Sequence, residues 1–286
     1  MKIDLINACS DLGVHVNGSD KGPNFILDNN KLKINKIYSV KKDNVNKSLD
    51  INDKEKNLVS LNKFNEELYN VIKESLSSNS LPITLGGDHS VVIASALASI
   101  SKHKNLGVIW IDSHGDYNNF ETTISGNLHG LPFATITNFK DTQKLSCFHK
   151  ENFYNPKNSV LIGARDLDEL EIKNLEEAGI KIFTTDDIKE YGVSYVMDKA
   201  FKIASNNTIG VHISYDIDVI DPKLAPGVSI PAINGINIDE AYEIMDEIVK
   251  NKENIKSLDL VEYNPDTDID NKTMIIAQNL LKKFIN

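Results

Sequence analysis

The chain of 286 residues carries 31 basic and 41 acidic residues, a net charge of −10 that argues against a nucleic-acid-binding surface, which needs clustered basic side chains. Its two cysteines, Cys9 and Cys147, are too few for a disulfide framework and indicate a reducing, cytoplasmic setting. No run of about 18 apolar residues predicts a membrane span, and the N-terminal residues lack the apolar core of a signal peptide.

Short apolar runs alternate with helical patterns along the chain. Several of these runs lack strict alternation of apolar and polar residues, as is typical of strands that are buried on both faces of a sheet. The predicted strands are 1–7, 81–85, 106–112, 158–162, 180–183, 208–214 and 255–261. The predicted helices are 61–77, 89–102, 168–178, 193–205, 238–250 and 269–284.

This order of elements predicts a three-layer α/β/α fold with a mostly parallel sheet and right-handed crossover connections. The sequence contains no internal repeat and no Pro/Gly/Ser-rich linker, so residues 1–286 are expected to form a single domain. Residues 28–58 are rich in Lys, Asn and Asp, and we expect them to form an exposed excursion with one short strand inside it.

Histidines and acidic residues follow four of the predicted strands. They are His89 after 81–85, the set Asp112, His114 and Asp116 after 106–111, the pair Asp216 and Asp218 after 208–214, and Glu262 after 255–261. The carboxyl ends of parallel strands meet at one edge of the sheet, where the ligands of such folds bind. If the extended geometry continues past the strand ends, Asp112, His114 and Asp116 share one face.

Four aspartates and two histidines at one sheet edge indicate a metal site. Crowded carboxylates repel one another unless cations neutralise them, and carboxylates with imidazoles favour Mn²⁺, Mg²⁺ or Fe²⁺. Two ions suit hydrolysis, because a water between them loses a proton near neutral pH. The predicted ligands are His89, Asp112, His114, Asp116, Asp216 and Asp218. An isolated Asp-x-Asp pair more often serves turns and caps, and Asp88 is the expected N-cap of the next helix.

Five segments resemble the arginase–agmatinase (ureohydrolase) family in order and spacing. They are GGDHS at 86–90, IDSHGDYN at 111–118, SGNLHG at 125–130, SYDIDVIDP at 214–222 and VEYNP at 261–265. The resemblance extends from GSDKGPNFI at 18–26 to residue 273, so it covers most of the chain. It implies an arginase-like fold and a small-molecule guanidino substrate, hydrolysed to urea and an amine with the help of two Mn²⁺ ions.

The resemblance also implies a role for each site residue. By motif, His89 and Asp116 are similar to ligands of one ion, His114 and Asp218 to ligands of the other, and Asp112 and Asp216 to bridging ligands. In the reaction it implies, a hydroxide formed at the metals attacks the guanidinium carbon and donates a hydrogen bond to Asp116. His129 resembles the histidine that gives the leaving amine its proton. Glu262 resembles the acid that clamps the planar guanidinium.

Two loops point to the substrate. The loop 117–130, YNNFETTISGNLHG, resembles the arginase type, in which an Asn, a Thr and a Ser hold the α-carboxylate. The corresponding residues are Asn118, Thr123 and Ser125. The loop 163–171, GARDLDELE, resembles the one whose acid receives the α-amino group, with Asp168 in that place and Glu171 in support. Agmatine has no α-carboxylate, so this set favours L-arginine as the substrate, giving L-ornithine and urea.

Three alternatives stay open. An agmatinase or another guanidino-compound hydrolase would keep the metal site and recognise a different substrate. A catalytically weak relative that binds metal or arginine is supported by Ile230, which stands where the family usually has a threonine near the guanidinium. Either Ser229 compensates for that missing hydroxyl, or the activity or the substrate differs. A deacetylase-type metal hydrolase shares the general architecture, but the GGDHS and SGNLHG segments favour the ureohydrolases.

Arg165 is the only arginine of the chain, and it lies in the 163–171 loop. The arginine guanidinium is a rigid, planar group with several hydrogen-bond donors, and lysine cannot supply this arrangement. We therefore expect Arg165 to brace this loop through a carboxylate or backbone carbonyls. Family members are commonly trimers or hexamers, so a homo-oligomer is also expected. No role is assigned to His15.

Overall fold

The computed structural model describes residues 2–27, 32–44, 46–50 and 52–286. Its strands form one eight-stranded sheet in the order β2-β1-β3-β8-β7-β4-β5-β6, and every neighbouring pair is parallel. The strands are β1 (Lys2–Cys9), β2 (Lys36–Lys41), β3 (Ser80–Gly86), β4 (Gly107–Ile111), β5 (Ser159–Ala164), β6 (Lys181–Thr184), β7 (Val211–Asp216) and β8 (Ile255–Val261). All seven predicted strands are confirmed, and β2 is the short strand expected within 28–58.

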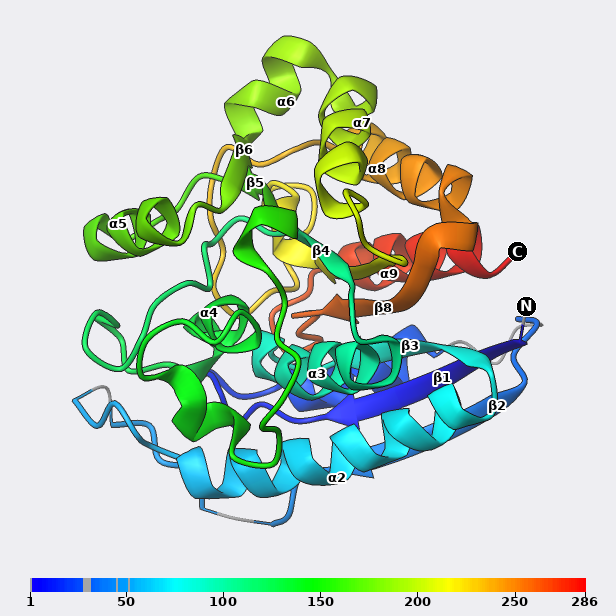
Figure 1. Cartoon of the computed structure of the whole chain (residues 1–286). Coiled ribbons are helices and arrows are strands. Elements are labelled where there is room, and N and C mark those ends of the chain that lie inside the picture. Colours follow the sequence, from blue (N-terminus) through cyan, green and yellow to red (C-terminus); the bar gives the residue numbers. More distant parts are fainter. Residues whose placement is uncertain (1, 28–31, 45, 51) are drawn as a thin grey trace.

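Nine helices pack against the sheet in the described part of the chain (Figure 1). They are α1 (Gly22–Ile26), α2 (Leu58–Ser77), α3 (Val92–His103), α4 (Pro132–Ile136), α5 (Glu169–Ala178), α6 (Thr185–Tyr191), α7 (Val193–Ala204), α8 (Ile238–Lys250) and α9 (Lys272–Ile285). The six predicted helices are confirmed. The other three, α1, α4 and α6, have five to seven residues and therefore too few turns to show a helical period in the sequence.

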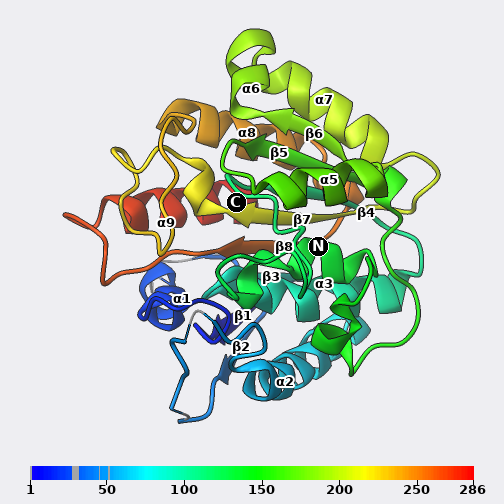
Figure 2. The same ribbon diagram turned by 90° about the vertical axis from the view of Figure 1, so that its left-hand side faces the viewer.

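The helices form one layer on each face of the sheet. Along β4, Val108 and Trp110 pack into the apolar cluster that contains α2, α3, α4 and α5. Ile109 and Ile111 point the other way, into the cluster that contains α7, α8 and α9. Figures 1 and 2 show α2 and α3 on the opposite side of the strands from α8 and α9. The predicted three-layer α/β/α architecture is confirmed.

The four central strands of the sheet, β3, β8, β7 and β4, are neighbours in space although they are distant in sequence. Because they are parallel, the loops that leave their carboxyl ends meet at one edge of the sheet. These are the loops that carry His89, Asp112, Asp216 and Glu262. Among the described residues, no helix has the length and apolar character needed to cross a bilayer.

Candidate functional site

The side chain of His89 lies at the centre of three carboxylates. Its Nδ1 atom is 3.0 Å from a carboxylate oxygen of each of Asp112, Asp116 and Asp216. Its Nε2 atom is 2.7 Å from Ser214 Oγ. One ring nitrogen carries at most one proton, so Nδ1 cannot satisfy three buried carboxylate oxygens. A cation held between the imidazole and the carboxylates fits this donor set.

A second group of ligand atoms surrounds His114. Its Nδ1 atom is 3.0 Å from Asp218 Oδ2 and 3.5 Å from Asp112 Oδ1. Ser113 donates both its backbone N–H and its hydroxyl to Asp218 Oδ1, at 3.2 and 2.7 Å, which fixes that carboxylate. In each group the candidate ligand atoms lie within 4.8 Å of one another, and Asp112 belongs to both groups. The geometry therefore suits two adjacent cation positions that share one carboxylate.

Turns, and not continued strands, bring these side chains together. β4 ends at Ile111, and Asp116 has a left-handed backbone with a φ of 49°. Asp216 is the last residue of β7 and caps a 3-10 turn, in which its Oδ1 accepts the N–H of Asp218 at 2.7 Å. The expected alternation along an extended chain is therefore wrong beyond the strand ends. Asp116 and Glu262, with a φ of 68°, both adopt a backbone conformation that costs non-glycine residues free energy.

The pKa values reflect the crowding of carboxylates in this cluster. Burial by itself would lower the pKa of His89, but the charge of Asp116 and the adjoining carboxylates raise it well above its ordinary value. Burial and repulsion from Asp112 raise the pKa of Asp116 to about 6. Burial, followed by repulsion from Asp218 and Asp112, raises the pKa of Asp216 well above the usual range. Cations at the cluster would relieve both the burial cost and the repulsion.

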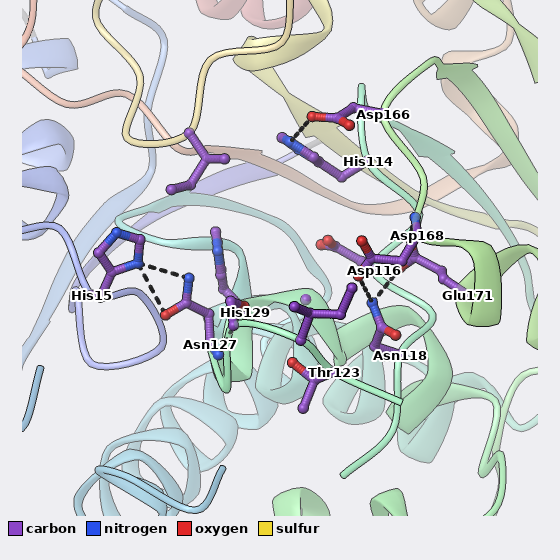
Figure 3. Close-up of a pocket in the computed structure, with 14 residues that line it drawn as sticks. His15, His114, Asp116, Asn118, Thr123, Asn127, His129, Asp166, Asp168 and Glu171 are labelled. Carbon is purple, nitrogen blue, oxygen red and sulfur yellow. Dashed lines mark hydrogen bonds and ion pairs between the residues drawn. The ribbon is translucent and has the colours of Figure 1, made fainter. Parts of the chain in front are cut away.

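A pocket of about 310 Å³ opens beside the cluster (Figure 3). Eight predicted site residues line it, namely His114, Asp116, Asn118, Thr123, Ser125, His129, Asp168 and Glu171. The other predicted residues, His89, Asp112, Asp216, Asp218 and Glu262, are buried and do not line it. The sequence thus predicted a set of residues that the fold does bring to one place.

His129 on the pocket wall pairs with Glu262, which is buried behind it. His129 Nδ1 is 2.8 Å from Glu262 Oε1, which also accepts the backbone N–H of His89 at 2.7 Å. Since Nδ1 is engaged, Nε2 is the nitrogen of His129 that a pocket ligand can use. Burial by itself would lower the pKa of His129, but the charge of Glu262 raises it. Glu262 Oε2 is buried and makes no hydrogen bond within the described chain.

Three of the predicted substrate residues, Asn118, Asp168 and Glu171, form a connected polar wall. Asn118 Nδ2 donates to Asp168 Oδ2 at 3.3 Å and to Glu171 Oε1 at 3.2 Å. Asp168 and Glu171 also form the capping box at the start of α5, which sets their positions. Thr123 Oγ1 accepts the N–H of Gly126 at 3.1 Å, whereas Ser125 is exposed. Burial raises the pKa of Glu171 to about 8.

The structure adds three polar residues to the pocket wall that the sequence did not assign, namely His15, Asn127 and Asp166. His15 lies in the segment between β1 and α1, and its Nδ1 is within hydrogen-bond distance of the Asn127 amide, at 2.9 to 3.2 Å. Asn127 lies inside the SGNLHG segment, so the sequence could have identified it as a site residue from that segment. No feature of the sequence places residue 15 beside residue 127.

Ile230 lines the pocket, and the neighbouring Ser229 does not. Ser229 is buried, and its Oγ accepts a hydrogen bond from Asn264 Nδ2 at 3.1 Å. The hydroxyl of Ser229 is thus held away from the pocket, so it does not replace the missing threonine hydroxyl. The pocket wall at this point is apolar.

Arg165 braces its loop through backbone carbonyls, as expected. Its guanidinium donates to the carbonyls of Asp218 at 2.8 Å, Val219 at 2.9 Å, Ala232 at 2.9 Å and Ile233 at 3.1 Å. The first two carbonyls lie at the 3-10 turn that follows β7, and the last two lie in the loop before α8. One side chain therefore ties the loop after β5 to the loop after β7.

We expect Arg165→Lys to lower kcat/KM for the substrate about tenfold and to lower the melting temperature, because buried carbonyls left without a donor cost about 1–3 kcal/mol. The measurements are steady-state urea release and thermal unfolding. Lys189→Ala is the matched control, since Lys189 donates from an exposed position to Asn234 in the same loop. Unchanged kinetics in Arg165→Lys would contradict the bracing role.

The chain resembles known arginases over its whole length. The family model described as the Arginase family matches residues 1–286. An arginase of Brevibacillus brevis is 40% identical over 222 residues, covering 76% of this chain and 72% of the relative. An arginase of Bacillus subtilis is 35% identical over 292 residues, covering 99% and 97%. The crystal structure of Entamoeba histolytica arginase with L-ornithine has a TM-score of 0.91 and 27% identity, covering 99% of this chain and 98% of that chain. The chain therefore belongs to the arginase family, and it is a ureohydrolase.

Proposed function

We propose that this enzyme hydrolyses L-arginine to L-ornithine and urea. The observation that carries the proposal is that one pocket combines two kinds of group. His114, Asp116 and His129 line one part of it, and the polar wall around Asn118 and Asp168 lines another. A guanidinium at the cluster end would thus place an amino-acid group against the polar wall. The arginase names of the similar proteins, one of them solved with L-ornithine, support this choice.

We further propose two Mn²⁺ ions as the cofactor, since carboxylates with one imidazole per position favour this kind of ion. His89 and Asp116 would hold one ion, His114 and Asp218 the other, and Asp112 and Asp216 both. When bound, the ions would supply Lewis-acid activation of water near neutral pH. The buried Nδ1 of His89, with three carboxylate oxygens at 3.0 Å, supports the first position.

The chain's own residues then orient the reactants and handle the proton. The oxygen of water forms a bond to the guanidinium carbon, and the bond from that carbon to the δ-nitrogen of the substrate breaks. Water gives up both of its protons as its oxygen becomes the urea carbonyl. Asp116 Oδ2 accepts one of them and passes it to the δ-nitrogen, and the other replaces the proton that His129 gives up. His129 gives a proton from Nε2 to the departing amine while Glu262 stabilises the charged imidazole from the other side. The unpaired Oε2 of Glu262 remains available to the guanidinium.

Urea release by the protein purified with Mn²⁺ tests this proposal, with L-arginine, agmatine and other guanidino compounds as substrates. L-arginine is expected to be preferred. Ser125→Ala should lower kcat/KM for L-arginine about tenfold, as expected for loss of one hydrogen bond to a charged group, and leave agmatine hydrolysis unchanged. Preference for agmatine would contradict the α-carboxylate assignment of Asn118, Thr123 and Ser125 and favour an agmatinase.

Ile230→Thr is expected to raise kcat/KM for L-arginine up to about tenfold, because it restores a hydroxyl beside the guanidinium end of the pocket. Ile230→Val is the matched control, since valine has the shape of threonine without the hydroxyl. Both variants are compared by initial rates of urea release. Equal rates in the two variants would show that the hydroxyl has no role in this enzyme. No activity in the parent protein, with metal bound, would support the catalytically weak alternative.

The remaining expectations are proposals of the same kind. We propose that residues 1–286 form one domain that acts in the cytoplasm as a homo-oligomer, a trimer or a hexamer. The continuous sheet supports one domain, and the family resemblance supports the oligomer. Sedimentation equilibrium measures the assembly directly, and a monomer at micromolar concentration would contradict it.

A further inference from the structure

We propose that His15 binds the α-carboxylate of the substrate and so selects amino-acid guanidines over guanidines that lack this group. The inference deepens the proposed function and rests on it. It is carried by the position of His15 on the pocket wall, by the charges of the other lining residues and by the partner of its ring.

His15 lies on the wall of the pocket that also holds Ser125 and Asn127. Figure 3 shows His15 and Asn127 on the opposite side of the pocket from Asp168 and Glu171. The pocket therefore has acidic groups on one side and an imidazole with neutral donors on the other. This polarity matches the zwitterionic end of an amino acid, whose ammonium and carboxylate need partners of opposite sign.

The charges of the pocket single out His15. Among the described residues that line it, none is Lys or Arg, whereas Asp116, Asp166, Asp168 and Glu171 are acidic. The other two lining histidines already face carboxylates. His114 faces Asp218 and Asp112, and His129 faces Glu262. In the described part of the chain the His15 ring contacts only the neutral Asn127 amide, so it is the lining imidazole that is free to pair with a carboxylate ligand.

The contact with Asn127 orients the ring for this purpose. His15 Nδ1 lies 2.9 Å from Asn127 Nδ2, which can donate to it, and 3.2 Å from Asn127 Oδ1, so the Asn127 amide engages this nitrogen. The other nitrogen, Nε2, is then left to donate to a ligand. The Asn127 backbone is fixed in turn, because its N–H donates to Ser125 Oγ at 3.2 Å. The imidazole and the Ser125 hydroxyl are thereby coupled on one wall.

Two lysines hold the backbones on which these side chains stand. Lys47 Nζ donates to the carbonyl of Val16, next to His15, at 2.8 Å. Lys56 is buried, and its Nζ donates to the carbonyl of Ser125 at 2.9 Å. Both lysines come from the excursion between β2 and α2, which therefore fixes the two loops before a ligand arrives. Such preorganisation strengthens a charge-assisted contact.

His15→Ala and His15→Gln test the proposal on the Mn²⁺-loaded enzyme. Glutamine keeps a hydrogen-bonding group beside Asn127 and removes the imidazole, so it separates the role of the ring from that of a polar side chain. Both variants should raise KM for L-arginine about tenfold, the size expected for a charge-assisted hydrogen bond, and should leave kcat within about twofold. Agmatine hydrolysis should be unchanged. At equilibrium, L-ornithine should bind about tenfold more weakly to the variants and putrescine equally well.

Asn17→Ala is the matched control, because Asn17 is an exposed neighbour in the same loop and does not line the pocket. It should behave as the parent protein. An equal effect of His15→Ala on L-arginine and agmatine, or an unchanged affinity for L-ornithine, would overturn the inference alone. A parent protein that hydrolyses agmatine and not L-arginine would overturn the proposed function, and this inference with it.

Discussion

Replacing Asp112 by asparagine is expected to abolish urea release, with a loss of at least about 10³-fold in kcat, because metal ions stabilise the transition state of hydrolysis by several kcal/mol. Asp112 is the residue common to both groups of ligand atoms, so its change disturbs both metal positions. Bound manganese, measured by mass spectrometry of the dialysed protein, should fall from two ions per chain to one or none.

The isosteric substitution separates ligand loss from structural damage. Without metal, Asp112→Asn should melt at or above the temperature of the metal-free parent, since one of four crowded carboxylates has lost its charge. Asp221→Asn is the matched control, because Asp221 lies in the same SYDIDVIDP segment, outside both groups of candidate ligand atoms, and accepts backbone N–H groups of Lys223 and Gly235. Two ions bound to an active Asp112→Asn protein would contradict the assignment of the site.

Glu262→Gln is expected to lower kcat/KM by about 10²- to 10³-fold, in the range that general acid catalysis contributes. Glutamine can still accept the N–H of His89, but it removes the negative charge that holds the pKa of His129 above its ordinary value. Because a nearby anion favours the imidazolium, the pKa of His129 should fall in the variant. A smaller fraction of His129 then carries the proton at neutral pH.

A double-mutant cycle with His129→Gln tests whether Glu262 acts through this histidine. If it does, the double variant should be no slower than His129→Gln alone. Additive losses would show that Glu262 acts directly on the guanidinium, which is the role that the family resemblance implies. Histidine proton shifts in NMR titrations follow the pKa of His129, and an unchanged pKa in Glu262→Gln would contradict the coupling between the two side chains.

The sequence predicted the fold well where apolar runs were long. Every residue of β3 is buried, as are all residues of β4, so these strands appear in the sequence as apolar runs. The boundaries were less certain, and β7 runs from Val211 to Asp216, two residues beyond the predicted end at 214. The short helices α1, α4 and α6 were missed because their positions depend on packing against the sheet more than on their own periodicity.

The site was predictable to the extent that its residues directly follow strands. His89, Asp112 and Asp216 are of this kind, and the topology alone brings them together. His15 is different, because its loop reaches the site through a tertiary contact, in which the N–H of His129 donates to the carbonyl of Gly13 at 3.0 Å. The orientation of Ser229 likewise depends on Asn264, a partner that no local pattern identifies.

The position of β8 has a consequence for how the chain folds. β8 is the last strand in sequence, yet it is the only link between the β2-β1-β3 half of the sheet and the β7-β4-β5-β6 half in the described structure. Until residues 255–261 are available, β3 and β7 each present an unpaired edge. Such edges favour association with other chains, and non-local pairing of this kind is slow. Metal capture, which needs ligands from both halves, therefore reports the completion of folding.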